Sequence, residues 1–379
     1  MWESVLDFKL SVRSGERMKE MTRREELKIL GVFSLLGGAG FREKVSAITT
    51  GHADVAGLAM EFIKEFQVPG LSIAIAKKGK LVCREAFGLA NIEAGKVLKA
   101  EDRFRIASIS KPITSAAIFL LIEQRKLNLN DRVFGREALL GIRNPGERLG
   151  RIEVYHLLTH TSGGWPNDKS DPMFQHIAMN HSELISWAIE NLPPDHAPGE
   201  VYAYSNFGYC LLGRIIEQVS GQTYEAFVRE NILRPCGIEE MRIAGLRPQK
   251  DEVSYYMKGK RLRFRMNVPR MDSHGGWVGT PADLVNFVMR VDGFTDPPDI
   301  LKSESIETMT KRNGINPDYA CGWNVNKAGN WWHNGSLPGL TSLLVRTSKD
   351  DCWAACANTR SGGMGLALDR LMWKISEKV

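Results

Sequence analysis

Ser108 and Lys111 are three residues apart and could together perform nucleophilic catalysis. Positions three apart on a helix project from the same face, so the hydroxyl and the amine would lie side by side. A serine hydroxyl is a weak nucleophile until a nearby base removes its proton, and a partly desolvated amine can be that base. The pattern alone is weak evidence, because a helix-capping serine followed by a surface lysine has the same spacing.

The flanking segments predict that Ser108 opens a buried helix. Residues 103–107 are strand-like, and Pro112–Arg125 carries apolar residues at helical spacing. Proline is tolerated in the first turn of a helix. The positive end of the helix dipole at this N-terminus favours the negative charge that develops on an acyl oxygen during nucleophilic attack.

A second pair of polar residues, Tyr204 and Asn206, lies on a predicted loop. The pair follows the turn at Pro198-Gly199 and precedes a helical run over Phe207–Val219. A tyrosine on such a loop offers a phenol for proton transfer. The asparagine offers an amide that can hold either the substrate or the lysine.

A third group lies between two strand-like runs near the C-terminus, at His333, Gly335 and Ser336. A donor or cationic residue, a spacer and a glycine on an edge strand let the backbone of a substrate approach closely. The backbone N–H of Ser336 can donate to an oxyanion.

In this order, the S-x-x-K, Y-x-N and H-x-G motifs resemble the three signatures of the serine β-lactamase and penicillin-binding protein superfamily. The resemblance is closest to the class C branch, with its DD-peptidases, D-aminopeptidases and β-lactamase-fold esterases. It extends over about residues 54 to 376. Other similar stretches are Val68-Pro69-Gly70, residues 156–163 (HLLTHTSG), Gly275-Gly276-Trp277 and residues 280–284 (TPADL).

The resemblance implies a role for each motif residue. Ser108 would be acylated, Lys111 and Tyr204 would share the proton transfer, and Asn206 would orient the substrate. The N–H groups of Ser108 and Ser336 would form the oxyanion hole.

The third motif departs from the class C β-lactamase pattern. Those enzymes usually carry Lys-Thr-Gly, whereas this chain has His333-Asn334-Gly335, which resembles the DD-peptidase, D-aminopeptidase and esterase branches. We therefore do not expect efficient β-lactam hydrolysis. A histidine whose pKa is near neutral would also make the charge of the site depend on pH.

Three functions remain open. The favoured one is a serine hydrolase that forms an acyl-enzyme, acting as a carboxylesterase on small or medium esters. The alternative is a penicillin-binding DD-peptidase or D-aminopeptidase with weak β-lactamase activity. A non-catalytic binding protein is the third, and the joint presence of Ser108, Lys111, Tyr204 and Asn206 argues against it. The expected partner is a small ester or amide substrate, no cofactor is expected, and the oligomeric state is open.

Composition sets broad limits on the function. The chain has 379 residues, 43% hydrophobic and 25% charged, which are ordinary globular values. A net charge of +6 is mild for this length and does not call for nucleic acid as a partner. Six scattered cysteines without C-x-x-C describe neither a zinc site nor a disulfide scaffold, so we expect buried free thiols.

Two further patterns have competing interpretations. His156 and His160 are four apart on a predicted helix, but Leu157 stands where an H-E-x-x-H zinc motif needs glutamate, so buried or capping histidines are favoured and no metal is expected. Basic and apolar residues alternate over Lys258–Arg265, which predicts a half-buried strand with a cationic outer face. A solvated face is favoured there over contact with an anionic substrate or surface.

Residues 1–47 differ from the rest of the chain. Arg23-Arg24 followed by an apolar run resembles a twin-arginine export signal, and a non-cleaved amphipathic helix is an equally supported interpretation. An export signal would make the protein periplasmic or secreted, and otherwise we expect it in the cytoplasm. The apolar run is too short to span a membrane, and we expect no transmembrane segment.

The remainder, residues 48–379, is expected to form one catalytic domain. A helix is predicted over Val55–Phe66, with strands over Leu71–Lys77 and Leu81–Leu89. Further strands are predicted over Ala320–Val325, Trp331–His333, Leu340–Thr347 and Trp353–Asn358, and a closing helix over Gly365–Lys378. The expected class is α+β with a β-lactamase/DD-peptidase-like fold. An antiparallel sheet from about residues 54–110 and 270–379 would be flanked by helices, with a mostly helical inserted region over about 111–269.

Overall fold

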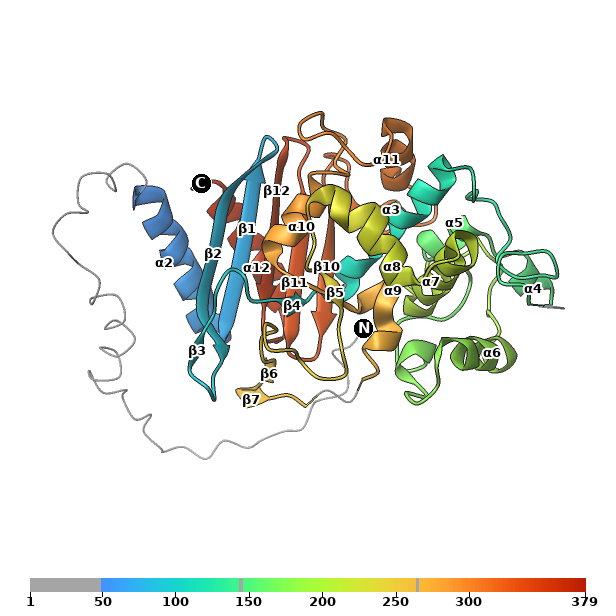
Figure 1. Ribbon diagram of the computed structural model, residues 1–379, viewed down its shortest axis with the longest axis horizontal. Coiled ribbons are helices and arrows are strands. Elements are labelled where there is room, and N and C mark those ends of the chain that lie inside the picture. Colours follow the sequence, from blue (N-terminus) through green and yellow to red (C-terminus); the bar gives the residue numbers. More distant parts are fainter. Residues whose placement is uncertain (1–48, 143–145, 264–265) are drawn as a thin grey trace. The chain divides into compact units, whose positions relative to one another are not determined.

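The central sheet is assembled from two segments that lie far apart in the sequence (Figure 1). The computed structural model describes residues 49–142, 146–263 and 266–379. Seven strands pair in the order β3-β2-β1-β12-β11-β10-β9, and every pairing is antiparallel. The strands are β1 (Gly70–Lys77), β2 (Lys80–Asn91), β3 (Lys96–Val97), β9 (Asn324–Val325), β10 (Trp331–Leu337), β11 (Leu340–Arg346) and β12 (Asp351–Ala357).

The join between the two segments is the β1–β12 pair, in which Leu71 lies opposite Ala357 and Lys77 lies opposite Asp351. Side chains alternate along each strand, so β1 sends apolar residues to both faces of the sheet. Ile73 and Ile75 face one core, while Ala74 and Ala76 face the other. A strand that is buried on both faces must be covered by helices on both sides.

Helices cover both faces accordingly. The first core packs α2 (Thr49–Phe66) and α12 (Met364–Ser376) against the sheet. The second, larger core contains α10 (Pro281–Val288) and the helical part of the chain. Figure 1 shows α10 in front of the sheet and α12 behind it. The α+β class with an antiparallel sheet flanked by helices is therefore confirmed.

The region between the two sheet segments is mostly helical. Its longer helices are α3 (Ser110–Glu123), α6 (His181–Asn191), α7 (Asn206–Ser220) and α11 (Ser303–Thr310), and its short ones are α4 (Glu147–Gly150), α5 (Val154–Leu158), α8 (Tyr224–Val228) and α9 (Asp272–Gly275). Two small sheets accompany them, β4 (Phe104–Arg105) with β8 (Trp277–Gly279) and β5 (Arg242–Ile243), and the pair β6 (Tyr256–Met257) with β7 (Lys260–Arg261).

Three local predictions need correction. Only Asn324–Val325 of the predicted strand Ala320–Val325 is extended, because the chain turns at Gly322 with φ +82°. The predicted helix around His156 ends at Leu158, and His160 lies beyond it with φ +59°. In the basic stretch from 258, the strand is limited to Lys260–Arg261 among the described residues, because Gly259 (φ +71°) forms the β6–β7 turn.

Other side-chain predictions hold. His156 caps its own helix, since its Nδ1 accepts a hydrogen bond from the N–H of Glu153, and His160 is fully buried. All six cysteines are buried and free. The possible export signal over residues 1–47 lies outside the described residues. Within the described part of the chain, no helix is long and apolar enough to cross a bilayer.

Candidate active site

Ser108 lies at the point where a short strand turns into a buried helix. Strand β4 leads into a 3₁₀ turn over Ala107–Ile109, and α3 begins at Ser110. Ala107 has φ +50°, a left-handed conformation that is uncommon for a residue with a side chain. Ser108 remains partly exposed, whereas Lys111 in the next turn has no exposed surface. A molecule in solution can therefore reach the Ser108 hydroxyl, while Lys111 stays out of water.

The amine of Lys111 is held by three oxygen atoms. Its Nζ lies 3.3 Å from Oγ of Ser108, 2.8 Å from Oδ1 of Asn206 and 3.0 Å from the backbone oxygen of His274. Burial lowers the pKa of Lys111 to about 7, although the nearby charge of Asp171 acts in the opposite direction. A large fraction of the amine is thus neutral near pH 7 and can accept the serine proton.

Tyr204 lies over the same amine, with Nζ of Lys111 4.6 Å from the centre of its ring. Burial raises the pKa of Tyr204 above its usual range, and a hydrogen bond with Ser108 opposes this only in part. The phenol therefore stays protonated at neutral pH. A protonated phenol at this place can donate to an oxygen or nitrogen atom, whereas the neutral amine of Lys111 can accept a proton.

Asn206 connects the amine to a buried carboxylate that the motifs do not reveal. Ser205 caps the start of α7, which fixes Asn206 in its first turn. The Nδ2 atom of Asn206 donates to Oδ2 of Asp171 at 2.8 Å and to Oδ1 of Asn167 at 3.0 Å. Asp171 is fully buried, and burial raises its pKa to about 6. Asp171 precedes Pro172 in an ordinary loop sequence, so only its place in the fold shows its connection to Lys111.

Strand β10 passes very close to the segment before Ser108, and Gly335 makes this possible. A Cβ atom at Gly335 would lie 2.2 Å from the backbone oxygen of Ile106 and 2.0 Å from Oγ of Ser342. Any side chain would therefore push the strand away from the nucleophile.

The outer edge of β10 faces away from β11. The side-chain amide of Asn324 donates to the carbonyl of Trp332, and Nδ1 of His333 donates to the carbonyl of Asn334. These two carbonyls therefore point away from β11. The N–H and C=O of one residue point to the same edge and alternate along an antiparallel strand. The backbone N–H of Ser336 therefore also points to the outer edge, which suits an oxyanion donor, while its side chain is exposed.

His333 is buried and joined to a hydrogen-bonded chain. The Nδ1 of His160 accepts from the N–H of Ser205, so Nε2 of His160 carries the proton and donates to Oη of Tyr319 at 3.1 Å. Tyr319 then donates to Nε2 of His333 at 3.2 Å, and Nδ1 of His333 donates to the Asn334 carbonyl. Burial is the main cause that lowers the pKa of His333 to about 3, so the ring is neutral at physiological pH.

The structure thus brings Ser108, Lys111, Tyr204 and Asn206 into one network, with Gly335 against the segment before the nucleophile. The catalytic and binding roles of these residues remain predictions. His333 reaches the network through Tyr319, a residue without a motif of its own. Within the described residues, no group of three His, Cys, Asp or Glu side chains is placed to hold a metal ion.

A sequence profile for the family described as Beta-lactamase matches residues 55–376. The chain belongs to the Beta-lactamase family. This match confirms the resemblance to the serine β-lactamase and penicillin-binding protein superfamily, whose members include serine peptidases, amidases and β-lactamases. The match covers both sheet segments and the helical region between them.

Two named relatives are similar to this chain at less than 30% identity. Penicillin-binding protein 4* of Bacillus subtilis (strain 168) is 29% identical over 301 residues, which are 73% of this chain and 64% of that protein. Protein flp of Staphylococcus aureus (strain MW2) is 25% identical over 299 residues, which are 76% of this chain and 59% of that protein. The chain therefore spans less than two thirds of the length of these relatives.

Solved structures share the fold over most of the chain. The octameric penicillin-binding protein homologue from Pyrococcus abyssi aligns with a TM-score of 0.69 and 27% identity, covering 85% of this chain and 77% of that one. The D-amino acid amidase from Ochrobactrum anthropi SV3, complexed with L-phenylalanine amide, aligns with a TM-score of 0.73 and 20% identity, covering 86% and 98%. At 20% identity this second likeness concerns the fold alone.

Proposed function

We propose that the protein is a serine hydrolase that forms an acyl-enzyme on Ser108 and acts on small or medium carboxylic esters. The observation that carries this proposal is the buried amine of Lys111, 3.3 Å from Oγ of Ser108, with a pKa lowered by burial to about 7. A base whose pKa is near the working pH is the most effective one for taking a proton in the transition state.

The reaction would begin when Lys111 takes the proton of Ser108 and Oγ attacks the ester carbonyl carbon. The N–H groups of Ser108 and Ser336 would stabilise the negative charge on the carbonyl oxygen. The tetrahedral intermediate then expels the alcohol, which receives a proton from Tyr204 or from protonated Lys111. Water attacks the acyl-enzyme, loses its proton to the same base system, and releases the acid and free Ser108.

The neutral state of His333 supports esters over β-lactams. A lysine at this position would present a permanent cation to the carboxylate that β-lactams carry. His333 is neutral at physiological pH and is engaged by Tyr319 and the Asn334 carbonyl. The protein should therefore bind the β-lactam carboxylate weakly, whereas the binding of a neutral ester does not depend on a cation at this position.

A DD-peptidase or D-aminopeptidase is the second candidate. It is favoured by the names of proteins that share the family or the fold, which include a penicillin-binding protein and a D-amino acid amidase. The same Ser108 chemistry would serve an amide, with Tyr204 donating to the leaving nitrogen.

The test is a hydrolysis panel with the full chain: short and long nitrophenyl esters, a chromogenic cephalosporin and D-alanyl peptides. We expect the best ester to be turned over faster than the cephalosporin. Ser108→Ala should lose covalent labelling by a fluorophosphonate and lower kcat/KM by about 10³-fold or more. The control is Ser361→Ala, which changes an exposed serine outside the network and should leave both readouts unchanged. A folded Ser108→Ala protein with more than a tenth of the activity would refute the assignment, and cephalosporin turnover above that of the best ester would make the protein a β-lactamase.

A further inference from the structure

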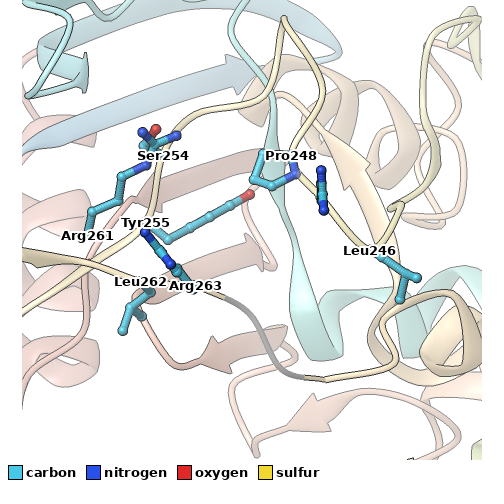
Figure 2. Close-up of a pocket in the computed structure, with 8 residues that line it drawn as sticks. Leu246, Pro248, Ser254, Tyr255, Arg261, Leu262 and Arg263 are labelled. Carbon is cyan, nitrogen blue, oxygen red and sulfur yellow. The ribbon is translucent and has the colours of Figure 1, made fainter. Parts of the chain in front are cut away.

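A pocket with a basic wall lies beside the β6–β7 hairpin (Figure 2). Its volume is about 730 Å³, and its lining includes Arg247, Arg261, Arg263 and Tyr255. In Figure 2 the side chain of Tyr255 points toward Pro248, Arg263 lies near its base, and the end of Arg261 lies near Ser254. The lining contains no acidic residue.

No ion pair is described for the guanidinium groups of these three arginines. Among the described residues, none of the three makes a hydrogen bond or an ion pair. Surface arginines are often merely solvated, but these three line one concave site. An anionic group bound there would lie among them, and an arginine suits a carboxylate because its planar fork can donate two parallel hydrogen bonds.

The acidic residues nearby are already used elsewhere. Asp251 pairs with Arg103 and Arg242, and Glu252 is buried against Arg105 at 2.9 Å. Glu93 accepts a hydrogen bond from Tyr256, and the charge of Arg261 is only the last of the causes that lower its pKa. The pocket therefore keeps a positive potential that a ligand can neutralise.

On one side, the pocket is hydrogen-bonded to β4, the strand that precedes Ser108. The hydroxyl of Tyr255 accepts a hydrogen bond from the N–H of Arg105 at 2.7 Å and donates to Glu252. Arg105 precedes Ser108 by three residues, a stretch of chain that spans at most about 10 Å. The wall of the pocket is thus fixed to the segment that carries the nucleophile.

On the other side, the pocket is in contact with the turn between β10 and β11. A Cβ atom at Gly339 would lie 2.6 Å from Cδ1 of Leu262 and 3.0 Å from Cβ of Tyr255, so the β10–β11 turn packs directly on two lining residues. Gly339 follows Ser336 by three residues. The pocket therefore adjoins the turn that follows β10.

The proton donors decide which part of a substrate can enter the pocket. The leaving alcohol must lie beside Tyr204 and Lys111, on the side of α7 and α5. The acyl chain would then extend away from them, and the path we infer for it follows β10 toward Gly339. Figure 1 shows β6 and β7 below the sheet and α7 to its right.

We propose that this arginine pocket binds a carboxylate at the far end of the acyl chain, so that the preferred substrates are esters of acids with a second, ionised carboxyl group. The proposal rests on the proposed ester hydrolysis at Ser108. It assigns a substrate class to that site. It also gives a function to the basic stretch that begins at Lys258, for which the sequence alone favours a solvated face.

The test compares matched esters with the full chain at low ionic strength. Mono-4-nitrophenyl succinate, adipate and suberate carry the terminal carboxylate, and 4-nitrophenyl butyrate, hexanoate and octanoate are their neutral counterparts. The measured quantity is the ratio of kcat/KM for each acidic ester to that for its neutral partner. We expect this ratio to be highest for the longer diacids, because the terminal carboxylate must extend past the end of β10 to reach the arginines. We also expect it to fall as salt is added.

The variants separate recognition from stability. The triple change Arg247→Gln, Arg261→Gln and Arg263→Gln should lower the suberate-to-octanoate ratio by about tenfold, the loss expected for a charge-assisted hydrogen bond. The single change Arg263→Gln should lower the ratio in the same direction, and it alters an exposed side chain. Arg136→Gln is the control, since Arg136 is exposed, lies outside the pocket and should not change the ratio.

The outcomes distinguish this proposal from the proposed function. A ratio that falls by less than threefold in the triple variant, or equal losses on both esters, would overturn the arginine pocket while leaving ester hydrolysis intact. If neither neutral nor acidic esters are hydrolysed by the unmodified protein, the proposed function fails first, and this substrate class fails with it.

Discussion

The carboxylate of Asp171 accepts a 2.8 Å hydrogen bond from the side-chain amide of Asn206. The other end of that amide accepts a hydrogen bond from Lys111, so one asparagine joins a buried carboxylate to the buried amine of Lys111. The orientation of the amide is fixed, because Nδ2 faces two acceptors and Oδ1 faces a donor. The network thereby sets both the position of Lys111 and the charge around it.

Asp171→Asn should change the pH dependence of the reaction. The charge of Asp171 raises the pKa of Lys111, so its removal should lower that pKa and shift the rising limb of kcat/KM to more acidic pH. The new amide must also turn an N–H group toward either Met173 N–H or Asn206 Nδ2, both of which are donors. We expect kcat to fall about tenfold, in line with one poorly satisfied buried contact.

The control for this variant is Asp195→Asn, which alters an exposed carboxylate with no described hydrogen bond and should leave the profile unchanged. The measurement is kcat/KM for a neutral ester from pH 5 to 9. A profile that keeps its midpoint while only its height falls would mean that Asp171 is structural and does not tune Lys111.

Lys111 itself should determine the rising limb in the unmodified protein. Its pKa is about 7, and only the neutral amine can take the serine proton, so activity should rise with pH through about 7 and then level off. Lys111→Arg should lower kcat by about 10³-fold at every pH, because guanidinium stays protonated.

Stopped-flow measurement of acylation by a nitrophenyl ester checks this prediction, with the exposed Lys64→Arg as a control that should behave like the unmodified protein. A Lys111→Arg protein with a normal acylation rate, or an unmodified protein whose activity is flat between pH 6 and 8, would contradict the assignment of Lys111 as the base.

Tyr319→Phe tests the chain that links two histidines. The phenylalanine ring keeps the aromatic contacts, but Nε2 of His160 and Nε2 of His333 both lose their hydrogen-bond partner in a buried place. We expect the free energy of unfolding to fall by about 1–3 kcal/mol per unsatisfied group. The neutral state of His333 should persist, because burial is the main cause of its low pKa.

Denaturant unfolding of Tyr319→Phe beside Tyr155→Phe measures the effect, since the hydroxyl of Tyr155 has no hydrogen bond among the described residues. Equal stability of the two variants would show that the histidine chain contributes nothing to the fold.

The sequence predicts those features that are encoded locally. The strands at 71–77, 81–89, 340–347 and 353–358 agree closely with β1, β2, β11 and β12, since each carries a continuous or alternating apolar run. The S-x-x-K spacing is enough to predict that Ser108 and Lys111 lie together, because one helical turn brings the two side chains to the same face.

What the sequence does not predict depends on contacts between distant segments. Asp171 and Tyr319 approach the site only because the fold brings them there, from loops with no recurring pattern. The low pKa of His333 comes mainly from burial in the folded chain, so it could not be read from the H-x-G motif alone. The turns at Gly322 and His160 interrupt runs that look regular, because one residue with positive φ ends a helix or strand without changing the apolar pattern around it.

Gly335→Ala tests whether the close approach of β10 to the nucleophile is needed for catalysis. The added methyl group would lie 2.2 Å from the backbone oxygen of Ile106 and 2.0 Å from Oγ of Ser342. The serine can rotate, but the backbone oxygen cannot move without shifting the segment that carries Ser108. The strand must therefore move out, and the N–H of Ser336 moves with it by a distance that an oxyanion hydrogen bond does not tolerate.

We expect Gly335→Ala to lower kcat about 10²-fold or more, the loss measured when one oxyanion donor is removed, with a smaller change in KM. The matched control is Gly365→Ala in α12, where an added Cβ meets nothing within 4 Å and the helix gains about 0.5–1 kcal/mol of stability. Burst kinetics with a nitrophenyl ester separate acylation from deacylation in both variants. Because the same N–H would stabilise both tetrahedral intermediates, both steps should slow together in Gly335→Ala. A variant in which only deacylation slows would place the function of β10 in the approach of water instead of the oxyanion hole.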